Sequence, residues 1–138
     1  MFECIGIKTK EELMYKEVVI GGHHYRVIPV VEMCGELITE NAMLERAKIL
    51  DANNGMEEFN YVLENAHDFL NKGLDGKCFV FTECVSVEHG DRFYACIHKQ
   101  PGHEKWLRHK ATNRLWGYSF HLLQRVRQTA KFIGQLGQ

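Results

Sequence analysis

The stretch from Lys77 to Gln100 constrains the fold more than any other part of the chain. Two runs dense in β-branched and aromatic residues, Cys78–Val87 and Arg92–Lys99, flank a short polar segment that contains His89-Gly90. Glycine at such a tip accepts the positive φ that tight hairpin turns require. The pattern therefore predicts one long β-hairpin that closes at His89-Gly90. Both faces of this ribbon are largely apolar, so we expect both to be covered.

A second hairpin is predicted nearer the N-terminus. Glu17–Ile20 and His23–Val31 are separated by Gly21-Gly22, and a glycine pair between β-branched runs supplies the backbone freedom of a tight turn. Pro29 has no N–H to donate. The second strand is therefore expected to lie at a sheet edge or to end in a bulge at this residue.

Two helices are predicted between the hairpins. Thr39–Asp51 consists of good helix formers and is followed by Asn53-Asn54-Gly55, residues that tolerate the left-handed conformation in which helices often end. Met56–Lys72 carries apolar residues at helical spacing, and Gly73 follows at the position of a C-terminal cap.

A long C-terminal helix is predicted from about His103 to Ile133, after the turn at Pro101-Gly102. A kink or break is expected between Thr112 and Gly117, because Asn113 and glycine are weak helix formers. The apolar stripe expected to face the core consists of Leu115, Leu122, Val126, Ala130 and Ile133.

The chain length of 138 residues fits one domain, 1–138, with a tail that frays from about residue 134. Residues 2–7 read as a short strand. Thr9 then starts a Thr-x-x-Glu capping box that begins a helical turn, unless this segment runs directly into the first hairpin. The predicted fold class is α+β: an antiparallel sheet of four to five strands built from two hairpins, with two acidic middle helices and one long basic C-terminal helix.

The five cysteines are scattered and odd in number, a pattern that favours free thiols over a disulfide framework. The N-terminus lacks the apolar run of a signal peptide, and no apolar stretch reaches 18 residues. We therefore expect a cytoplasmic protein with no membrane association.

The charges are divided unevenly along the chain. Residues 1–98 carry nine Lys/Arg against seventeen Asp/Glu, whereas residues 99–138 carry eight Lys/Arg against a single acid, Glu104. Blocks of like charge are often interaction surfaces, and arginine provides a planar fork for carboxylates and phosphates. An alternative interpretation is that the basic segment packs against the acidic helices of its own domain.

The basic segment is the predicted interaction surface, with an acidic protein or nucleic acid as partner. A homodimer, in which the acidic helices of one copy meet the basic helix of the other, is a further alternative. The predicted partner-binding residues are Arg108, Lys110, Arg114, Phe120, His121, Arg125, Lys131 and Phe132.

The alternative function is that of a small enzyme. A hairpin turn of two or four residues places Val87 opposite Arg92, and continuing that register places Glu83 opposite Cys96, with His98 on the same face. Cys96 is then the candidate nucleophile, His98 the base and Glu83 the group that orients the imidazole. A buried free cysteine more often behaves as a small hydrophobic residue.

Neither a metal nor a cofactor is predicted. Cys96, His98 and His103, with His23-His24, offer potential ligands, but the paired Cys-x-x-Cys or His-x-x-x-His spacing of structural zinc sites is absent. The glycines lack the spacing of nucleotide-binding loops. The favoured hypothesis is a small binding or regulatory protein that engages an acidic macromolecule.

Overall fold

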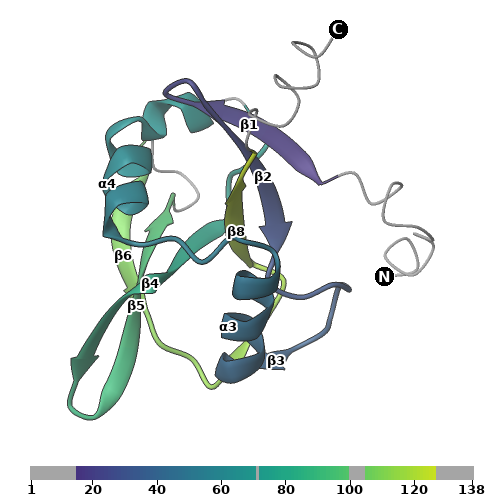
Figure 1. Cartoon of the computed structure of the whole chain (residues 1–138), viewed down its shortest axis with the longest axis vertical. Coiled ribbons are helices and arrows are strands. Elements are labelled where there is room, and N and C mark those ends of the chain that lie inside the picture. The colour runs from purple at the N-terminus through teal and green to yellow at the C-terminus, as the bar shows by residue number, and fades with distance from the viewer. Residues whose placement is uncertain (1–14, 71, 100–104, 127–138) are drawn as a thin grey trace, which may run out of the picture.

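The computed structural model describes residues 15–70, 72–99 and 105–126. Within them, six strands form one curled mixed sheet in the order β1-β2-β8-β4-β5-β6, and β3 pairs with β7 separately (Figure 1). The elements are β1 (Lys16–Ile20), β2 (His23–Pro29), β3 (Ile38–Thr39), α3 (Glu40–Ile49), α4 (Met56–Glu64), the 3₁₀-helix η1 (Ala66–Phe69), β4 (Cys78–Glu88), β5 (Asp91–His98), β6 (Leu107–Ala111), β7 (Leu115–Trp116) and β8 (Phe120–Arg125).

Both predicted hairpins are confirmed. The β1–β2 turn consists of Gly21 and Gly22, at φ 60° and 100°, and the β4–β5 turn consists of His89 and Gly90, at φ 53° and 85°. Two consecutive residues at positive φ match the right-handed twist of the flanking strands. β2 is an internal strand rather than an edge strand, and it ends at Pro29.

The predicted register of the long hairpin is correct near the turn and wrong beyond it. Val87 lies opposite Arg92, but the ladder shifts between Phe81 and Val85, so that Cys96 lies opposite Val80 and not Glu83. The shift is a β-bulge. Within the shifted stretch, the Glu83 N–H donates to the Asn54 carbonyl at 2.9 Å, a partner outside the ladder.

The two middle helices are confirmed, the second in shorter form. Thr39 caps α3 by accepting a hydrogen bond from the Ala42 N–H at 3.2 Å, and Asp51 follows the helix at φ 54°. The predicted helix 56–72 is divided at Asn65 into α4 and η1. The turn at Asn65 bends the chain, so that η1 packs beside β1.

The predicted long basic C-terminal helix is wrong over the described residues. β6, β7 and β8 lie within residues 107–125, and the segment from Thr112 to Gly117, where a break is expected, contains the two-residue strand β7. In β8, Leu122 and Leu123 are both buried, one on each face of the sheet. A strand buried on both faces is a continuous apolar run without period-2 alternation, so its periodicity does not distinguish it from a helix.

The predicted sheet of four to five antiparallel strands is therefore also wrong, although the α+β character holds. β8 inserts between the two hairpins, antiparallel to β2 and parallel to β4. Parallel pairing requires a long connection back to the sheet. Local hairpin signals do not reveal such a strand.

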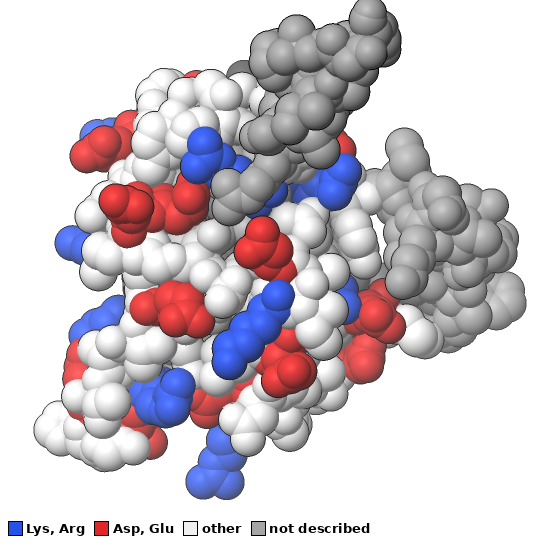
Figure 2. All heavy atoms as spheres, viewed as in Figure 1, with Lys and Arg blue, Asp and Glu red and all other residues white. Residues whose placement is uncertain are grey.

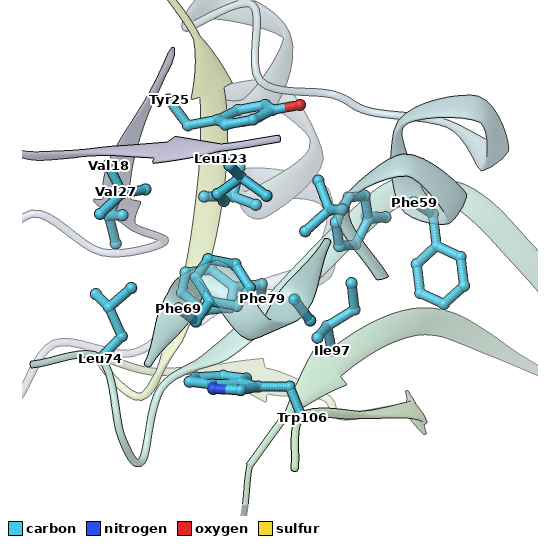
Figure 3. Packing of buried hydrophobic residues seen from close by; sticks show 14 of the residues in the cluster. Val18, Tyr25, Val27, Phe59, Phe69, Leu74, Phe79, Ile97, Trp106 and Leu123 are labelled. Carbon is cyan, nitrogen blue, oxygen red and sulfur yellow. The ribbon is translucent and has the colours of Figure 1, made fainter. Parts of the chain in front are cut away.

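Buried residues fill both faces of the sheet. On one face, α4 and η1 cover a cluster that includes Phe69, Phe79 and Trp106, and the Phe69 and Phe79 rings stack with centroids 4.9 Å apart (Figure 3). On the other face, Met43 and Ala47 of α3 pack with Trp116 and the opposite side of the sheet. The prediction that both faces of the long hairpin are covered holds for residues 78–82, whereas its tip is exposed.

Several predicted features lie outside the described residues. They are the strand at residues 2–7, the capping box that starts at Thr9, the continuation of the C-terminal helix beyond residue 126, and the fraying tail from about residue 134.

Candidate protein-binding groove

A groove of about 480 Å³ lies where the N-terminal end of α4 faces the β4, β5 and β6 strands. In Figure 1, α4 covers this side of the sheet and the β4–β5 hairpin extends beyond it. Most of the lining is apolar and three residues of β6 are basic. The lining residues are Met56, Phe59, Cys84, Val85, Ser86, Phe93, Ala95, Arg108, His109 and Lys110.

The bulge in β4 helps to form the groove. It brings the Glu83 backbone to the loop that precedes α4, and the Asn53 side chain also donates to the Glu83 carboxylate at 3.4 Å. Beyond the bulge, Cys84 joins the buried cluster under α4 while Val85 is 39% exposed. The floor of the groove is therefore apolar, and its outer wall is the protruding part of the hairpin.

The basic residues come from β6, the strand at one edge of the sheet. The Arg108 guanidinium lies 5.5 Å from the centroid of the Phe59 ring, and the Lys110 ammonium lies 5.7 Å from that of Phe93. Cations over aromatic rings cover apolar surface with their stems while keeping the charge accessible. Both side chains therefore extend over the groove face of the sheet.

The two cations differ in how they are neutralised. Lys110 pairs with Glu88, and this hydrogen bond lowers the pKa of the Glu88 carboxyl. Arg108 has no carboxylate within ion-pair distance among the described residues. Within the described part of the chain, its guanidinium contacts the Phe59 ring.

The rest of the surface carries mixed charge. Figure 2 shows acidic and basic side chains interspersed over the face that it draws, without a continuous basic area. Arg46 pairs with Glu32, and Arg92 with Glu40. Ion pairs within the chain thus neutralise some of its basic side chains.

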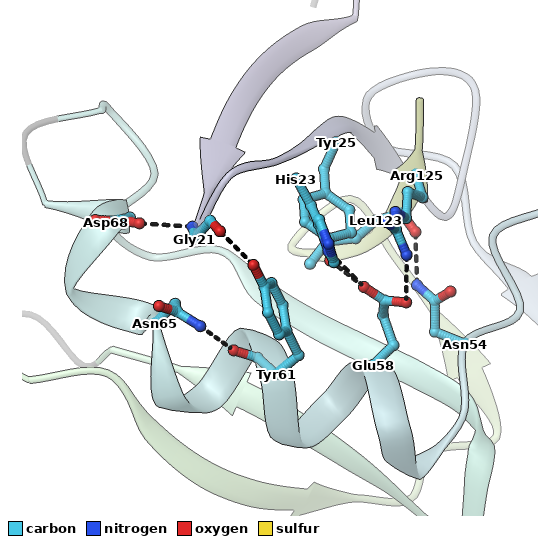
Figure 4. A network of polar contacts seen from close by, with 10 residues as sticks. All are labelled: Gly21, His23, Tyr25, Asn54, Glu58, Tyr61, Asn65, Asp68, Leu123 and Arg125. Atoms are coloured by element: carbon cyan, nitrogen blue, oxygen red, sulfur yellow. Dashed lines mark hydrogen bonds and ion pairs between the residues drawn. The ribbon is translucent and has the colours of Figure 1, made fainter. Parts of the chain in front are cut away.

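The β1–β2 turn fixes the position of α4. The Tyr61 hydroxyl donates to the Gly21 carbonyl, and the Gly21 N–H donates to the Asp68 carboxylate at 2.7 Å (Figure 4). Tyr61 also stacks on His23, with ring centroids 4.2 Å apart. These contacts connect the first hairpin to the helix that forms one wall of the groove.

A second contact, at the start of α4, centres on Glu58. Its carboxylate accepts a hydrogen bond from the Tyr25 hydroxyl. The carboxylate oxygens lie 3.9 Å from His23 Nδ1 and 3.9 Å from Arg125 Nη1 (Figure 4). Burial and the Glu58 carboxylate raise the pKa of the Tyr25 phenol. Tyr25 is therefore a neutral hydrogen-bond donor, and the cluster anchors α4 to β2 and β8.

The predicted partner-binding residues do not form one surface. Arg108 and Lys110 line the groove, whereas Arg114 is exposed outside its lining and Arg125 faces Glu58. Phe120 packs on Trp116 with ring centroids 4.7 Å apart. His121 is 3% exposed, and burial lowers its pKa to about 4. Lys131 and Phe132 lie outside the described residues.

The predicted catalytic residues are also separated. Glu83 is exposed on the bulge, whereas Cys96 is fully buried and lies opposite Val80. Contact with the Cys78 thiol and burial raise the pKa of Cys96. Burial and the neighbouring His109 lower the pKa of His98. Cys96 is therefore a protonated core thiol, remote from the carboxylate proposed to assist it.

Three of the described cysteines, Cys78, Cys84 and Cys96, are free, whereas Cys34 is not a free thiol. The expectation of free thiols therefore fails at Cys34. Among residues 15–70, 72–99 and 105–126, no group of three or more His, Cys, Asp or Glu side chains is arranged to hold a metal ion. No helix in this part of the chain is long and apolar enough to cross a membrane.

Sequence reasoning identified Arg108 and Lys110 but not the apolar groove beside them. Phe59 lies among the apolar residues at helical spacing in Met56–Lys72, and Phe93 lies in the second run of the long hairpin. Neither residue carries a local signal for the groove, because the groove exists only where α4 meets the bulged hairpin. The sequence sign of this site was the pair of basic residues two positions apart.

Comparison with protein-family models, with curated proteins and with solved structures finds no match to this chain. The groove and its residues are therefore interpreted from their own chemistry.

Proposed function

We propose that this is a binding protein whose groove between α4 and β6 accepts an acidic, partly apolar segment of another protein. The observation that carries the proposal is the position of Arg108, a cation without a carboxylate partner among the described residues, directly beside an apolar groove. Interfaces combine apolar anchors with charges that select the partner. The proposed partner is acidic, as the sequence also predicts, and the proposed binding surface is the groove beside β6.

The composition of the groove favours a protein over nucleic acid. Nucleic-acid sites generally neutralise several phosphates, and their affinity depends steeply on salt. Here one of two β6 cations is paired with Glu88, and the floor consists of aliphatic and aromatic side chains. Few charges beside much apolar surface suit a segment in which carboxylates alternate with apolar residues.

The proposal is tested with two labelled probes in fluorescence anisotropy. One is the acidic peptide acetyl-Thr-Val-Glu-Leu-Glu-Val-Thr-amide, and the other is a single-stranded DNA of mixed sequence. Arg108→Glu is expected to weaken peptide binding about tenfold, about 1.4 kcal/mol. Arg114→Glu is the matched control, because it reverses another exposed charge that lies outside the groove lining. Its effect is expected to be small.

Two results would overturn the proposal. One is a DNA affinity that exceeds the peptide affinity and falls steeply with salt. The other is equal loss of peptide binding in the two variants. Either result would assign the binding to diffuse charge rather than to the groove.

The enzyme alternative has less support. Glu83 and Cys96 do not lie opposite one another, and the Cys96 thiol is buried and protonated. Thiol labelling, described in the Discussion, tests this alternative directly.

A further inference from the structure

We infer that the acidic segment adds to the sheet as a seventh strand along the outer edge of β6, where it borders the groove. The inference rests on the proposed function and specifies how the partner binds. β6 is the last strand of the six-stranded sheet, and no other strand of the described part of the chain pairs with its outer edge. A strand edge presents unpaired N–H and C=O groups that an extended peptide satisfies with its own backbone.

The opposite edge of the sheet is less suitable. At β1, Glu17 forms an ion pair with Arg26 at 3.2 Å, and η1 packs beside the strand. In β6, by contrast, Leu107 to Lys110 are all exposed. The exposed residues of β6 and Arg108, which has no carboxylate partner among the described residues, thus occur at the same edge.

The side chains of β6 specify the pattern of the partner. Arg108 and Lys110 lie opposite Ile97 and Ala95 and share the groove face. Leu107 and His109 alternate with them along the strand, and His109 also borders the groove. Neighbouring strands place directly opposed side chains about 5 Å apart, and opposite charges there are favourable. A complementary strand therefore carries carboxylates at alternate positions toward the groove. The apolar residues between them lie on the opposite face of the sheet, the face of Leu107.

The same charges disfavour a second copy of this chain as the occupant. An antiparallel pair of β6 strands centred on His109 places Arg108 of each copy opposite Lys110 of the other. Like charges directly opposed across strands are destabilising. The basic edge thus discriminates against self-association while it accepts an acidic strand.

Amide hydrogen exchange of the full chain, followed by NMR, tests the inference with the same acidic peptide. In an antiparallel pair, alternate residues direct their N–H groups toward the partner strand. The β6 amides that do not bond to β5 are expected to exchange rapidly in the free protein and at least tenfold more slowly with peptide bound. Slowing should therefore alternate along residues 107–111. N-methylation of the peptide residues whose N–H groups face β6 should weaken binding about tenfold. N-methylation of the intervening residues should weaken binding little.

The outcomes separate this inference from the proposed function. Peptide binding that depends on Arg108 but leaves the β6 amides unprotected would overturn strand addition and keep the groove. If a peptide with lysine in place of both glutamates protects the β6 amides as well as the acidic peptide does, strand addition stands and the acidic preference is overturned. No binding of the acidic peptide would overturn both. A dimer in light scattering, with β6 amides already protected in the free protein, would identify a second copy as the occupant.

Discussion

The contact between the β1–β2 turn and α4 leads to a prediction about Gly21. The residue lies at φ 60°, and a Cβ at this position would be 2.6 Å from the Tyr61 hydroxyl oxygen and 2.7 Å from Cγ of Asn65. Carbon atoms in ordinary contact lie about 3.5–4.0 Å apart. Gly21→Ala therefore forces the Tyr61 and Asn65 side chains away from the turn.

Two costs add in this variant. The left-handed conformation costs an alanine roughly 1–2 kcal/mol. Displacing well-packed groups costs about 1–3 kcal/mol more, since the Tyr61–Gly21 hydrogen bond and the stacking on His23 are disturbed. We expect a total loss of roughly 2–5 kcal/mol, a large share of the stability of a domain of this size.

Gly73→Ala is the matched control. Gly73 has a similar φ of 72°, and its added Cβ would meet only Lys16 Nζ, at an ordinary 3.6 Å. This variant should lose only the conformational cost of about 1–2 kcal/mol. Urea denaturation monitored by circular dichroism gives both free energies of unfolding, provided that the m-values agree.

The packing explanation also predicts a rescue. Tyr61→Phe with Asn65→Ala removes the three atoms that crowd the added Cβ, so the Gly21→Ala substitution should be less costly in that background. Equal losses in Gly21→Ala and Gly73→Ala, within about 0.5 kcal/mol, would refute the reasoning. The absence of rescue would contradict the assignment of the clash.

Three further predictions concern buried side chains. Because burial lowers the folded-state pKa of His121 from 6.5 to about 4, the unfolded chain binds the proton more readily between these values. Stability should fall as pH decreases through this window, by about 3 kcal/mol in total, and His121→Gln should remove this contribution, as urea denaturation at several pH values would reveal. Burial raises the thiol pKa values of Cys84 and Cys96, the latter also through its contact with Cys78, so both should react with iodoacetamide at pH 8 far more slowly in the folded protein than in urea. Rapid labelling of Cys96 in the folded protein, detected by mass spectrometry, would restore the enzyme hypothesis. Phe69→Ala should cost about 3–5 kcal/mol by leaving a cavity between aromatic rings, whereas Leu70→Ala, at an exposed neighbouring position, should change the free energy of unfolding little.

Local chemistry was sufficient to predict the hairpins and the starts of the middle helices. Gly21-Gly22 and His89-Gly90 adopt positive φ because of their own covalent structure and that of their neighbours, and Thr39 caps a helix three residues away in sequence. The information lies within a few residues of each feature. It can therefore be obtained without knowledge of the remaining chain.

Long-range contacts decided the features that were predicted wrongly. Residues 120–125 form a strand because β2 and β4 provide ladder partners on both sides, about 95 and 40 residues earlier in the chain. Within the bulge, the Glu83 N–H bonds to the Asn54 carbonyl, which lies outside the hairpin. A register derived from the turn alone could not include that hydrogen bond.

The candidate site divides in the same way. The sequence by itself determined that Arg108 and Lys110 are cations two residues apart, which share a face in any β-strand. Only the tertiary structure decided that this face borders an apolar groove and that β6 is a sheet edge. The physical reason is that charge and strand periodicity are properties of consecutive residues, whereas a groove and an unpaired edge depend on which distant elements pack together and which remain uncovered.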